Sequence, residues 1–409
     1  MYHKGTGSTT IILEIVNMMR SSYIWYLVLL LVTTAGCKKP YNPPVISGDN
    51  HYLVVEGVIN SDQDSTFISL SRTVKITEDV RTQPVVNCKV VIEGEQGGSY
   101  TLQPADGGKY FTGPMHLDVA KKYRLHITTP DNKEYASDYV EVRQTPPIDS
   151  IGFVLKNNNL QLYVNTHNAT NNSRYYRWEY AEAWKFHAKY NTDFIADPAA
   201  NMVRGRTKEE EVYYCFADDR SSNIIIGSSA KLAQDVIYQG PINAIPRDAE
   251  KLEMRYSILV KQYALTKDGY QFWENLRKNT EKLGSIFDAQ PTQLQGNIHS
   301  INNPAEPVIG YVSITNTQSK RIFIDNSQLP NDWLPKYPYD CGAPDSAFNF
   351  NAKSGIHEVD AYIINGSGIP LAKIFIAGIA VGYTYSTEPC AVCTIRGRIQ
   401  QPSFWIDKK

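Results

Sequence analysis

The 409-residue sequence lacks the motifs that identify several enzyme classes. It has no H-E-x-x-H pair, no G-x-S-x-G turn and no G-x-x-x-x-G-K-[ST] loop. These motifs place the zinc ligands of metalloproteases, the nucleophile of α/β-hydrolases and the phosphate cradle of P-loop NTPases. We therefore assign no catalytic residue, no metal ligand and no cofactor, and we predict a protein that is not an enzyme.

An excess of charge of either sign is also missing. The chain has 41 Lys and Arg against 42 Asp and Glu, a net charge of −1, and the basic residues form no stripe. Proteins that bind nucleic acids concentrate Lys and Arg to neutralise phosphates. We therefore expect no nucleic-acid partner.

No apolar run is long enough to cross a membrane. The longest near the N-terminus, Tyr23 to Val32, has ten residues, whereas a spanning helix needs about 20. Arg20 precedes the run and the small residues Thr33 to Gly36 follow it, an arrangement typical of a secretory signal. We predict a signal peptide over residues 1–36, of which 1–17 are a start-site over-extension, because Met18 and Met19 stand directly before Arg20.

The residue after the predicted cleavage point is Cys37, and Ala35-Gly36-Cys37 resembles a bacterial lipobox. The resemblance implies cleavage before Cys37 and acylation of that cysteine, and two or three acyl chains anchor a protein stably. The alternative is a buried free cysteine after an ordinary signal. We expect lipidation, with residues 37–50 as the lipidated cysteine and its proline-containing tether.

Cysteine is scarce, with six residues in the chain. Once Cys37 is assigned to lipid, five remain, so at least one is free or pairs elsewhere. Cys390 and Cys393 form a C-x-x-C motif, which fits a local disulfide, half of a metal site or a redox pair. We expect the disulfide, because no second ligand pair and no helix-opening context is evident. Counting leaves a Cys215–Cys341 bond as an option, and Cys88 fits a buried position.

What the sequence does contain is β patterning. From Tyr52 onward, apolar and polar residues alternate between turn signals such as Gly97-Gly98. We predict a mainly β fold: an immunoglobulin-like β-sandwich at 51–146, then a larger β-rich domain at 147–409 with one main helix near 266–282. Most of the segments after this helix, among them "PVIGYVSITNTQSKRIFI", "AYIINGSG" and "LAKIFIAGIAVGYTY", are expected to be strands.

Tyrosine is abundant, with 27 residues. On the strand that begins at Arg174, Tyr176, Trp178 and Tyr180 share one face, while Arg177 and Glu179 lie on the other. The aromatic face fits a ligand-binding platform or, as the more common alternative, a sandwich core. We carry Tyr176, Trp178 and Tyr180 forward as candidate ligand-binding residues, with Arg177 and Glu179 as a polar rim.

Several blocks together resemble the Bacteroidota outer-membrane lipoprotein family catalogued as domain of unknown function 4249. The blocks, in order, are the lipobox followed by "KKPYNPP", then "LVVEGVIN", "SLSRTV", "IDSIGF", "YYRWEYAEAW", "RYSILVKQYALTKDGYQFWENLRKNTEKLGSIFDAQPTQLQGNIHS" and "CAVCTIRGRIQQPSFW". The resemblance implies an outer-membrane lipoprotein, commonly encoded beside a TonB-dependent receptor. It supplies no reaction and no catalytic residues.

Taken together, these features predict a non-enzymatic binding or accessory subunit. Cys37 would anchor it in the outer-membrane bilayer, more often at the cell surface than at the periplasmic face. Its expected partner, from the resemblance, is a TonB-dependent receptor in nutrient uptake. A structural or adhesive surface protein is the alternative, and a hydrolase would need a convergent acid–base pair.

Overall fold

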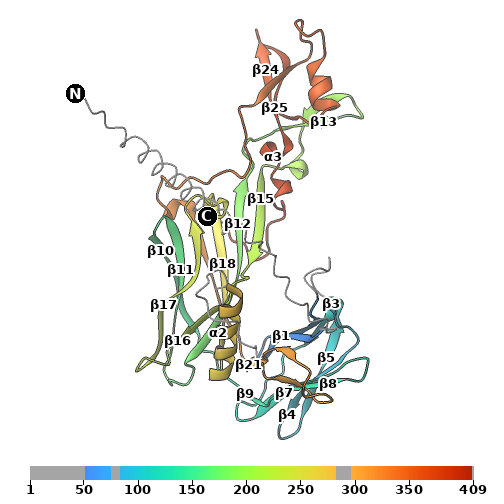
Figure 1. Ribbon diagram of the computed structural model, residues 1–409. Helices are drawn as coiled ribbons and strands as arrows, with labels where there is room; N and C mark the ends of the chain where they lie inside the picture. The colour runs from blue at the N-terminus through green and yellow to red at the C-terminus, as the bar shows by residue number, and fades with distance from the viewer. Residues whose placement is uncertain (1–50, 75–82, 282–295, 408–409) are drawn as a thin grey trace, which may run out of the picture. The chain divides into compact units, whose positions relative to one another are not determined.

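Strands are the predominant secondary structure, as the alternating sequence predicted (Figure 1). The computed structural model describes residues 51–74, 83–281 and 296–407. Residues 51–409 form one compact unit, and residues 1–50, with Cys37 and the predicted signal and tether, lie outside the described residues. The predicted fold class is confirmed: the protein is mainly β, with an N-terminal sandwich, further β sheets and one main helix.

The first sandwich is built by a single 12-stranded sheet that curves around one core. Strand β5 pairs with β4 on one side and with β6 on the other, and so joins the two halves of the sheet. Alternate residues such as Leu53, Val90 and Leu125 are fully buried in the shared core. The strands are β1 (Leu53–Asn60), β2 (Thr66–Arg72), β3 (Gln83–Pro84), β4 (Lys89–Gly94), β5 (Ser99–Ala105), β6 (Lys109–Thr112), β7 (Lys122–Thr128), β8 (Glu134–Ser137), β9 (Val140–Glu141), β19 (Ile298–Ser300), β20 (Val308–Gly310) and β21 (Ser313–Thr315).

Three of these strands come from far along the chain. β19 pairs with β8, while β20 and β21 run parallel to β1. The segment predicted as the second domain, 147–409, thus supplies three strands to the first sandwich. Each has three residues, too few for local alternation to indicate a distant partner.

The second sandwich packs a three-stranded sheet against a five-stranded one. Leu160 and Val164 of the smaller sheet share a core with Phe186 and Ile258 of the larger. The smaller sheet contains β10 (Ile148–Lys156), β11 (Asn159–Asn168) and β17 (Asp235–Pro246). The larger contains β12 (Tyr175–His187), β15 (Tyr214–Arg220), β16 (Ile225–Ser228), β18 (Arg255–Ala264) and β22 (Gln318–Asp325).

The predicted main helix is present as α2 (Lys267–Glu281). The Thr266 hydroxyl accepts a hydrogen bond from the Gly269 N–H at 3.1 Å, which caps the first turn. Phe272 is buried against the Tyr311 ring, and Tyr270 contacts Tyr175 on β12. The helix therefore packs on the face of β12 that points away from the second core.

A smaller group of elements, here called the hairpin lobe, comprises residues 194–205 and 345–386. Its core contains Ala347, Val359, Ile363 and Ile364. Residues Val359–Ile364 form the π-helical segment η5, so the segment Ala361 to Gly368 is the exception among those expected to be mostly strands. The strands are β13 (Phe194–Asp197), β14 (Met202–Gly205), β23 (Asp345–Phe348), β24 (Ile369–Ile376) and β25 (Ile379–Ser386).

The remaining helical segments are short. They are η1 (Asp106–Gly108), η2 (Lys208–Glu210), η3 (Glu250–Leu252), η4 (Asn326–Gln328), α3 (Glu388–Ala391) and η6 (Cys393–Ile395). A search of the described residues finds no helix with the length and apolarity needed to cross a membrane.

Candidate functional site

The aromatic face of β12 fills the core of the second sandwich. Tyr176 is 0% exposed and Trp178 2% exposed, and Tyr180 packs against the same core. The Tyr176 hydroxyl donates to Asp235 Oδ1 at 2.9 Å, and Trp178 Nε1 donates to Gln262 Oε1 at 2.8 Å. Their polar atoms are therefore satisfied inside the protein. The more common alternative, a sandwich core, is confirmed for this face of the strand, and the candidate ligand platform at Tyr176, Trp178 and Tyr180 is corrected.

The opposite face of β12 carries a coupled polar cluster. The Arg177 guanidinium forms an ion pair with Glu179 and lies 3.9 Å from the centroid of the Trp273 ring. Glu179 also accepts a hydrogen bond of 3.0 Å from the Tyr263 hydroxyl. Burial, and then the charge of Glu179, raise the pKa of Tyr263, so its hydroxyl stays protonated and serves as a donor.

These residues lie in rows across the outer face of the five-stranded sheet. Arg177 pairs in register with Tyr263, and Glu179 with Lys261. Lys261 in turn pairs with Ser319 of β22. Because side chains in register share a face, the rows present charged, hydroxyl and aromatic groups together.

A groove of about 700 Å³ lies over this face. Besides the cluster on β12 and β18, it is lined by residues of β1 and β2 and of the turn between them. The charged side chains there are those of Glu56 and Asp64, and the aromatic one is that of Phe67, which is 58% exposed. The groove therefore combines carboxylates, cations and aromatic surface.

One hydrogen bond joins the two walls of the groove: Asn60 Nδ2 of β1 donates to the Thr317 hydroxyl, just before β22, at 2.9 Å. The Ser61 N–H donates to the Thr315 carbonyl at 3.1 Å and extends the pairing of β1 with β21 within the first sandwich. Thr317 lies in the short linker between β21 of the first sandwich and β22 of the second. The chain itself therefore connects the two walls at this end of the groove.

A glycine is required in the wall formed by β1. Gly57 has φ +143°, and a Cβ atom there would lie 2.4 Å from the Phe67 carbonyl oxygen. Any side chain would push β2 away from β1, because backbone atoms cannot yield as a flexible side chain can. Gly57 thus sets the position of Phe67 at the groove.

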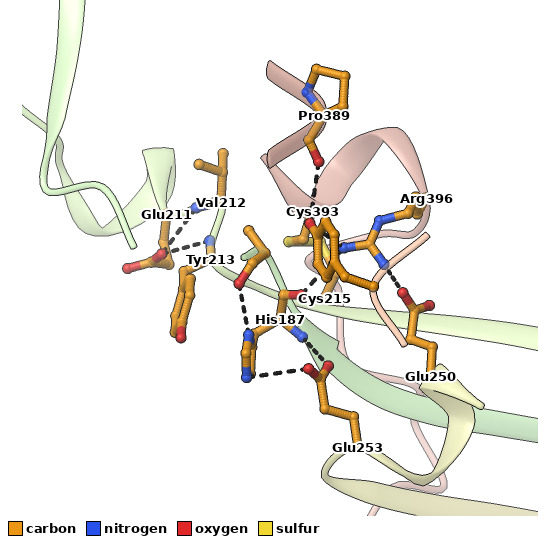
Figure 2. Close-up of a disulfide and its surroundings, with 12 residues drawn as sticks. His187, Glu211, Val212, Tyr213, Cys215, Glu250, Glu253, Pro389, Cys393 and Arg396 are labelled. Atoms are coloured by element: carbon orange, nitrogen blue, oxygen red, sulfur yellow. Dashed lines mark hydrogen bonds and ion pairs between the residues drawn. A yellow bond between two sulfur atoms is a disulfide. The ribbon is translucent and has the colours of Figure 1, made fainter. Parts of the chain in front are cut away.

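Two disulfides correct the predicted cysteine pairing. Cys215 of β15 bonds to Cys393, as Figure 2 shows, and Cys341 bonds to Cys390. The local Cys390–Cys393 bond and the Cys215–Cys341 alternative are both wrong. The Cys393 N–H donates to the Val212 carbonyl at 2.9 Å, which places η6 beside the start of β15 and directs Cys393 to Cys215. Spacing in the sequence carries no information about this contact.

Cys88 is free and buried, as expected. Burial raises the pKa of its thiol, which makes the thiolate scarce at neutral pH. Cys37 lies outside the described residues, and its lipidation stays a prediction.

A histidine–carboxylate pair adjoins the Cys215–Cys393 disulfide (Figure 2). His187 Nε2 lies 3.3 Å from a Glu253 oxygen, and the His187 N–H donates to the other oxygen at 3.0 Å. Burial raises the pKa of Glu253. His187 Nδ1 lies 2.6 Å from the Ala188 carbonyl. Both ring nitrogens therefore have partners within the fold.

Arg396 ties the same C-terminal segment to the second sandwich. It pairs with Glu250 and donates to the Tyr337 hydroxyl at 2.8 Å. Its guanidinium lies 4.6 Å from the centroids of both the Phe186 and the Tyr337 rings. Burial lowers the pKa of Arg396 to about 10, so it is still charged at neutral pH. This cluster has the features of a structural tie.

In the part of the chain that the structure describes, no three His, Cys, Asp or Glu side chains are grouped so as to hold a metal ion. Asp218 pairs with Arg398 and Asp219 lies 3.5 Å from Lys251. The strongest candidate site is thus the groove.

Sequence reasoning identified part of this groove. Alternation along β12 placed Arg177 and Glu179 together on one polar face of the strand. The contributions of Glu56 and Asp64 were missed, because they depend on contacts between segments more than 100 residues apart. No local signal could have found them.

The fold and groove define a β-rich protein with two sandwiches and a polar cleft. Residues 38–321 match the family described as Domain of unknown function (DUF4249). Since this match spans more than half of the chain, the protein belongs to that family. No curated protein matches the chain.

Among solved structures, the chain aligns with the adhesin InvE of Yersinia pseudotuberculosis. The alignment has 6% sequence identity and a TM-score of 0.14, and it covers 82% of this chain and 73% of the adhesin chain. A score of this size supports no argument about fold or function.

Proposed function

We propose that this protein is a lipid-anchored, non-enzymatic binding protein whose groove captures a small zwitterionic ligand such as a short peptide. The single observation that carries the proposal is the set of uncompensated charges of both signs in one groove. Lys261, Glu56 and Asp64 all line it, and none of the three has an ion-pair partner among the described residues.

The surroundings of these charges support recognition of a ligand. Arg177 is neutralised by Glu179 and held by Trp273, which leaves Lys261 as the available cation. A carboxylate reaching Lys261 and an ammonium reaching Glu56 or Asp64 would each form a charge-assisted hydrogen bond. The exposed ring of Phe67 offers an apolar contact beside them. Ligand sites typically combine a few placed polar groups with such surface.

The test is thermal unfolding of the protein with a panel of dipeptides and tripeptides, and with neutral oligosaccharides for comparison. A peptide present at 100 times its Kd should stabilise the protein by about 2.7 kcal/mol. Lys261→Ala should weaken binding at least tenfold, while Lys231→Ala, an exposed lysine that does not line the groove, should leave it unchanged. Stabilisation by oligosaccharides alone, or equal binding by both variants, would refute the zwitterionic assignment.

We further propose that the protein acts at the outer membrane beside a TonB-dependent transporter. A lipid at Cys37 and the tether of residues 37–50 would hold the groove near the transporter and raise the local ligand concentration. The test is a gentle-detergent pull-down from native outer membranes through a C-terminal tag, identified by mass spectrometry. A stoichiometric receptor is expected with the wild type, and recovery of the protein alone would contradict the partnership.

A further inference from the structure

The tip of the β24–β25 hairpin exposes an uninterrupted apolar surface. Phe375 is 61% exposed, Ile376 59% and Ile379 69%. Every residue from Phe375 to Ala380 is exposed. Single exposed apolar residues are common, but a contiguous group of this kind marks an interaction site.

The apolar surface covers both faces of the hairpin. Phe375 and Ile376 are consecutive in β24, so their side chains point to opposite faces. Ile379 lies directly across from Ile376 in the register of the two strands. A sheet that docks on a protein surface needs one apolar face. A hairpin tip that is apolar on both faces suits immersion in an apolar medium.

The turn between β24 and β25, Ala377-Gly378, has no polar side chain, although hairpin turns usually favour polar residues. Ala377 has φ +48° and Gly378 has φ +83°. Two-residue turns of this type favour Asn or Gly at the first position, because other side chains are strained at positive φ. The β10–β11 hairpin of the same chain follows that preference, with Asn157 at φ 53° and Asn158 at φ 58°. The β24–β25 turn instead has alanine.

The single positive charge of the hairpin indicates that the apolar medium is a lipid bilayer with anionic headgroups. Lys373 is the one charged residue in strands β24 and β25. It is exposed, and its ammonium lies 5.5 Å from the centroid of the Phe194 ring. A lysine behind an apolar tip matches the anionic headgroups above the acyl chains of a bilayer. The tip is also far smaller than the 20–30 residues that a stable protein interface uses on each side.

We propose that the β24–β25 hairpin tip inserts into the interface of a phospholipid bilayer. Phe375, Ile376 and Ile379 enter the acyl region, and Lys373 contacts the anionic headgroups. The inference does not depend on the groove or its ligand. It gives the protein a membrane contact in addition to the lipid predicted at Cys37.

The test uses the mature chain, residues 37–409, with Cys37→Ser so that no acyl chain is present. Flotation is measured with vesicles of phosphatidylethanolamine and phosphatidylglycerol at 3:1, and with pure phosphatidylcholine. The unacylated chain should float with both, and more strongly with the anionic vesicles. The double variant Phe375→Ser/Ile379→Ser should partition at least tenfold more weakly into both. Lys373→Ala should remove only the preference for anionic lipid.

A matched control is Leu232→Ser/Leu334→Ser, which removes two exposed leucines outside the hairpin. This variant should float as well as the unacylated chain with an unchanged hairpin. All of the substituted apolar side chains are exposed, so circular dichroism and the Tm should be unchanged. As a direct readout, Phe375→Trp should gain fluorescence quenching by brominated lipid above that of the unsubstituted chain.

Three results would overturn the proposal. The first is a folded chain that does not float, and the second is a hairpin double variant that floats as well as the control. The third is binding to protein-containing outer-membrane vesicles but not to protein-free vesicles of the same lipids, which would assign the hairpin to a protein partner. None of these measurements depends on ligand binding, so failure here is distinguishable from failure of the groove proposal.

Discussion

Among the residues that the structure describes, twenty-two buried ones form the core of the first sandwich, whereas four form the core of the hairpin lobe. The cysteine in the first sandwich, Cys88, is free. At the hairpin lobe, by contrast, the Cys341–Cys390 disulfide closes the segment that contains β23, η5, β24 and β25. The larger region is held by apolar packing, and the smaller one has a covalent link at its base.

This difference follows from size. A small region buries too little apolar surface to offset the conformational entropy of ordering its chain. A disulfide stabilises such a region chiefly by restricting its unfolded state. The hairpin lobe can therefore leave Phe375, Ile376 and Ile379 exposed, because its order does not depend on burying them.

The largest expected effect comes from removing core volume in the first sandwich. Leu125 is 0% exposed on β7, and Leu125→Ala should destabilise this sandwich by about 2–5 kcal/mol through lost burial and a residual cavity. Urea unfolding, with hydrogen exchange to locate the loss, measures the effect. Val119→Ala, at a position that is 56% exposed, should change stability by less than about 0.5 kcal/mol. The contrast between the two regions would be wrong if a reductant, which breaks the disulfides, destabilised this sandwich as much as Leu125→Ala does.

The next effect comes from the cross-link of the hairpin lobe. Cys341→Ser/Cys390→Ser should cost this region about 2–4 kcal/mol, since the bond joins residues 49 positions apart. Hydrogen exchange should rise in peptides from 345–386 and stay unchanged in peptides from 89–128. The Cys215–Cys393 bond is intact in this variant, so hydrogen exchange of the peptides around it should not change. Equal protection of the 345–386 peptides in variant and wild type would show that their small core suffices.

Local pattern was sufficient for the mainly β class, the main helix and the buried Cys88. Alternation and periodicity depend on neighbours within one element, so the sequence displays them directly. It also displayed the two faces of β12, although not which of them is buried. The aromatic residues fitted a ligand platform or, more commonly, a sandwich core, and they fill the core because the three-stranded sheet covers that face.

Long-range contacts account for the features that the local sequence pattern did not predict. The pairing of β20 and β21 with β1, the Cys215–Cys393 bond and the placement of Glu56 opposite Lys261 each join segments far apart in sequence. Residues 361–364 are apolar enough for a strand, yet they belong to the π-helical segment η5, which brings Val359, Ile363 and Ile364 into one small core. A short apolar run does not by itself distinguish a strand from a buried helical turn.

A smaller effect is expected from a single hydroxyl in the first sandwich. Tyr110 is 1% exposed, and its hydroxyl accepts from the Cys88 N–H at 2.9 Å and donates to the Val85 carbonyl at 3.0 Å. Burial raises the pKa of Tyr110 to about 12, so it is protonated at neutral pH. Tyr110→Phe should cost about 1–3 kcal/mol, because it leaves buried backbone groups unpaired. Tyr139→Phe, at a partly exposed ring, is the control for urea unfolding, and equal costs would contradict the assignment.

The smallest effect is electrostatic and belongs to the segment that directly follows β14 of the hairpin lobe. Arg204 donates two hydrogen bonds of 2.8 Å to Glu210, and the Thr207 N–H donates a third of 2.9 Å. These bonds lower the pKa of Glu210 from 4.5 to about 2. Since the folded pKa lies below the unfolded one, the stabilisation is complete above pH 4.5 and is lost as the pH falls toward 2.

Glu210→Gln should therefore lower the Tm slightly at pH 7, and the gap to the wild type should close between about pH 4.5 and about pH 2. Glu209→Gln, at the exposed neighbouring position, should show no such closing gap. The measurement is thermal unfolding across this pH range, with hydrogen exchange of peptides from 194–210 to locate the change. A gap that stays constant with pH would mean that Glu210 acts through its shape and hydrogen bonds and not through its charge. Glu210 would then stabilise the segment after β14 through hydrogen bonds that do not need a charge, as the Tyr110 hydroxyl does in the first sandwich.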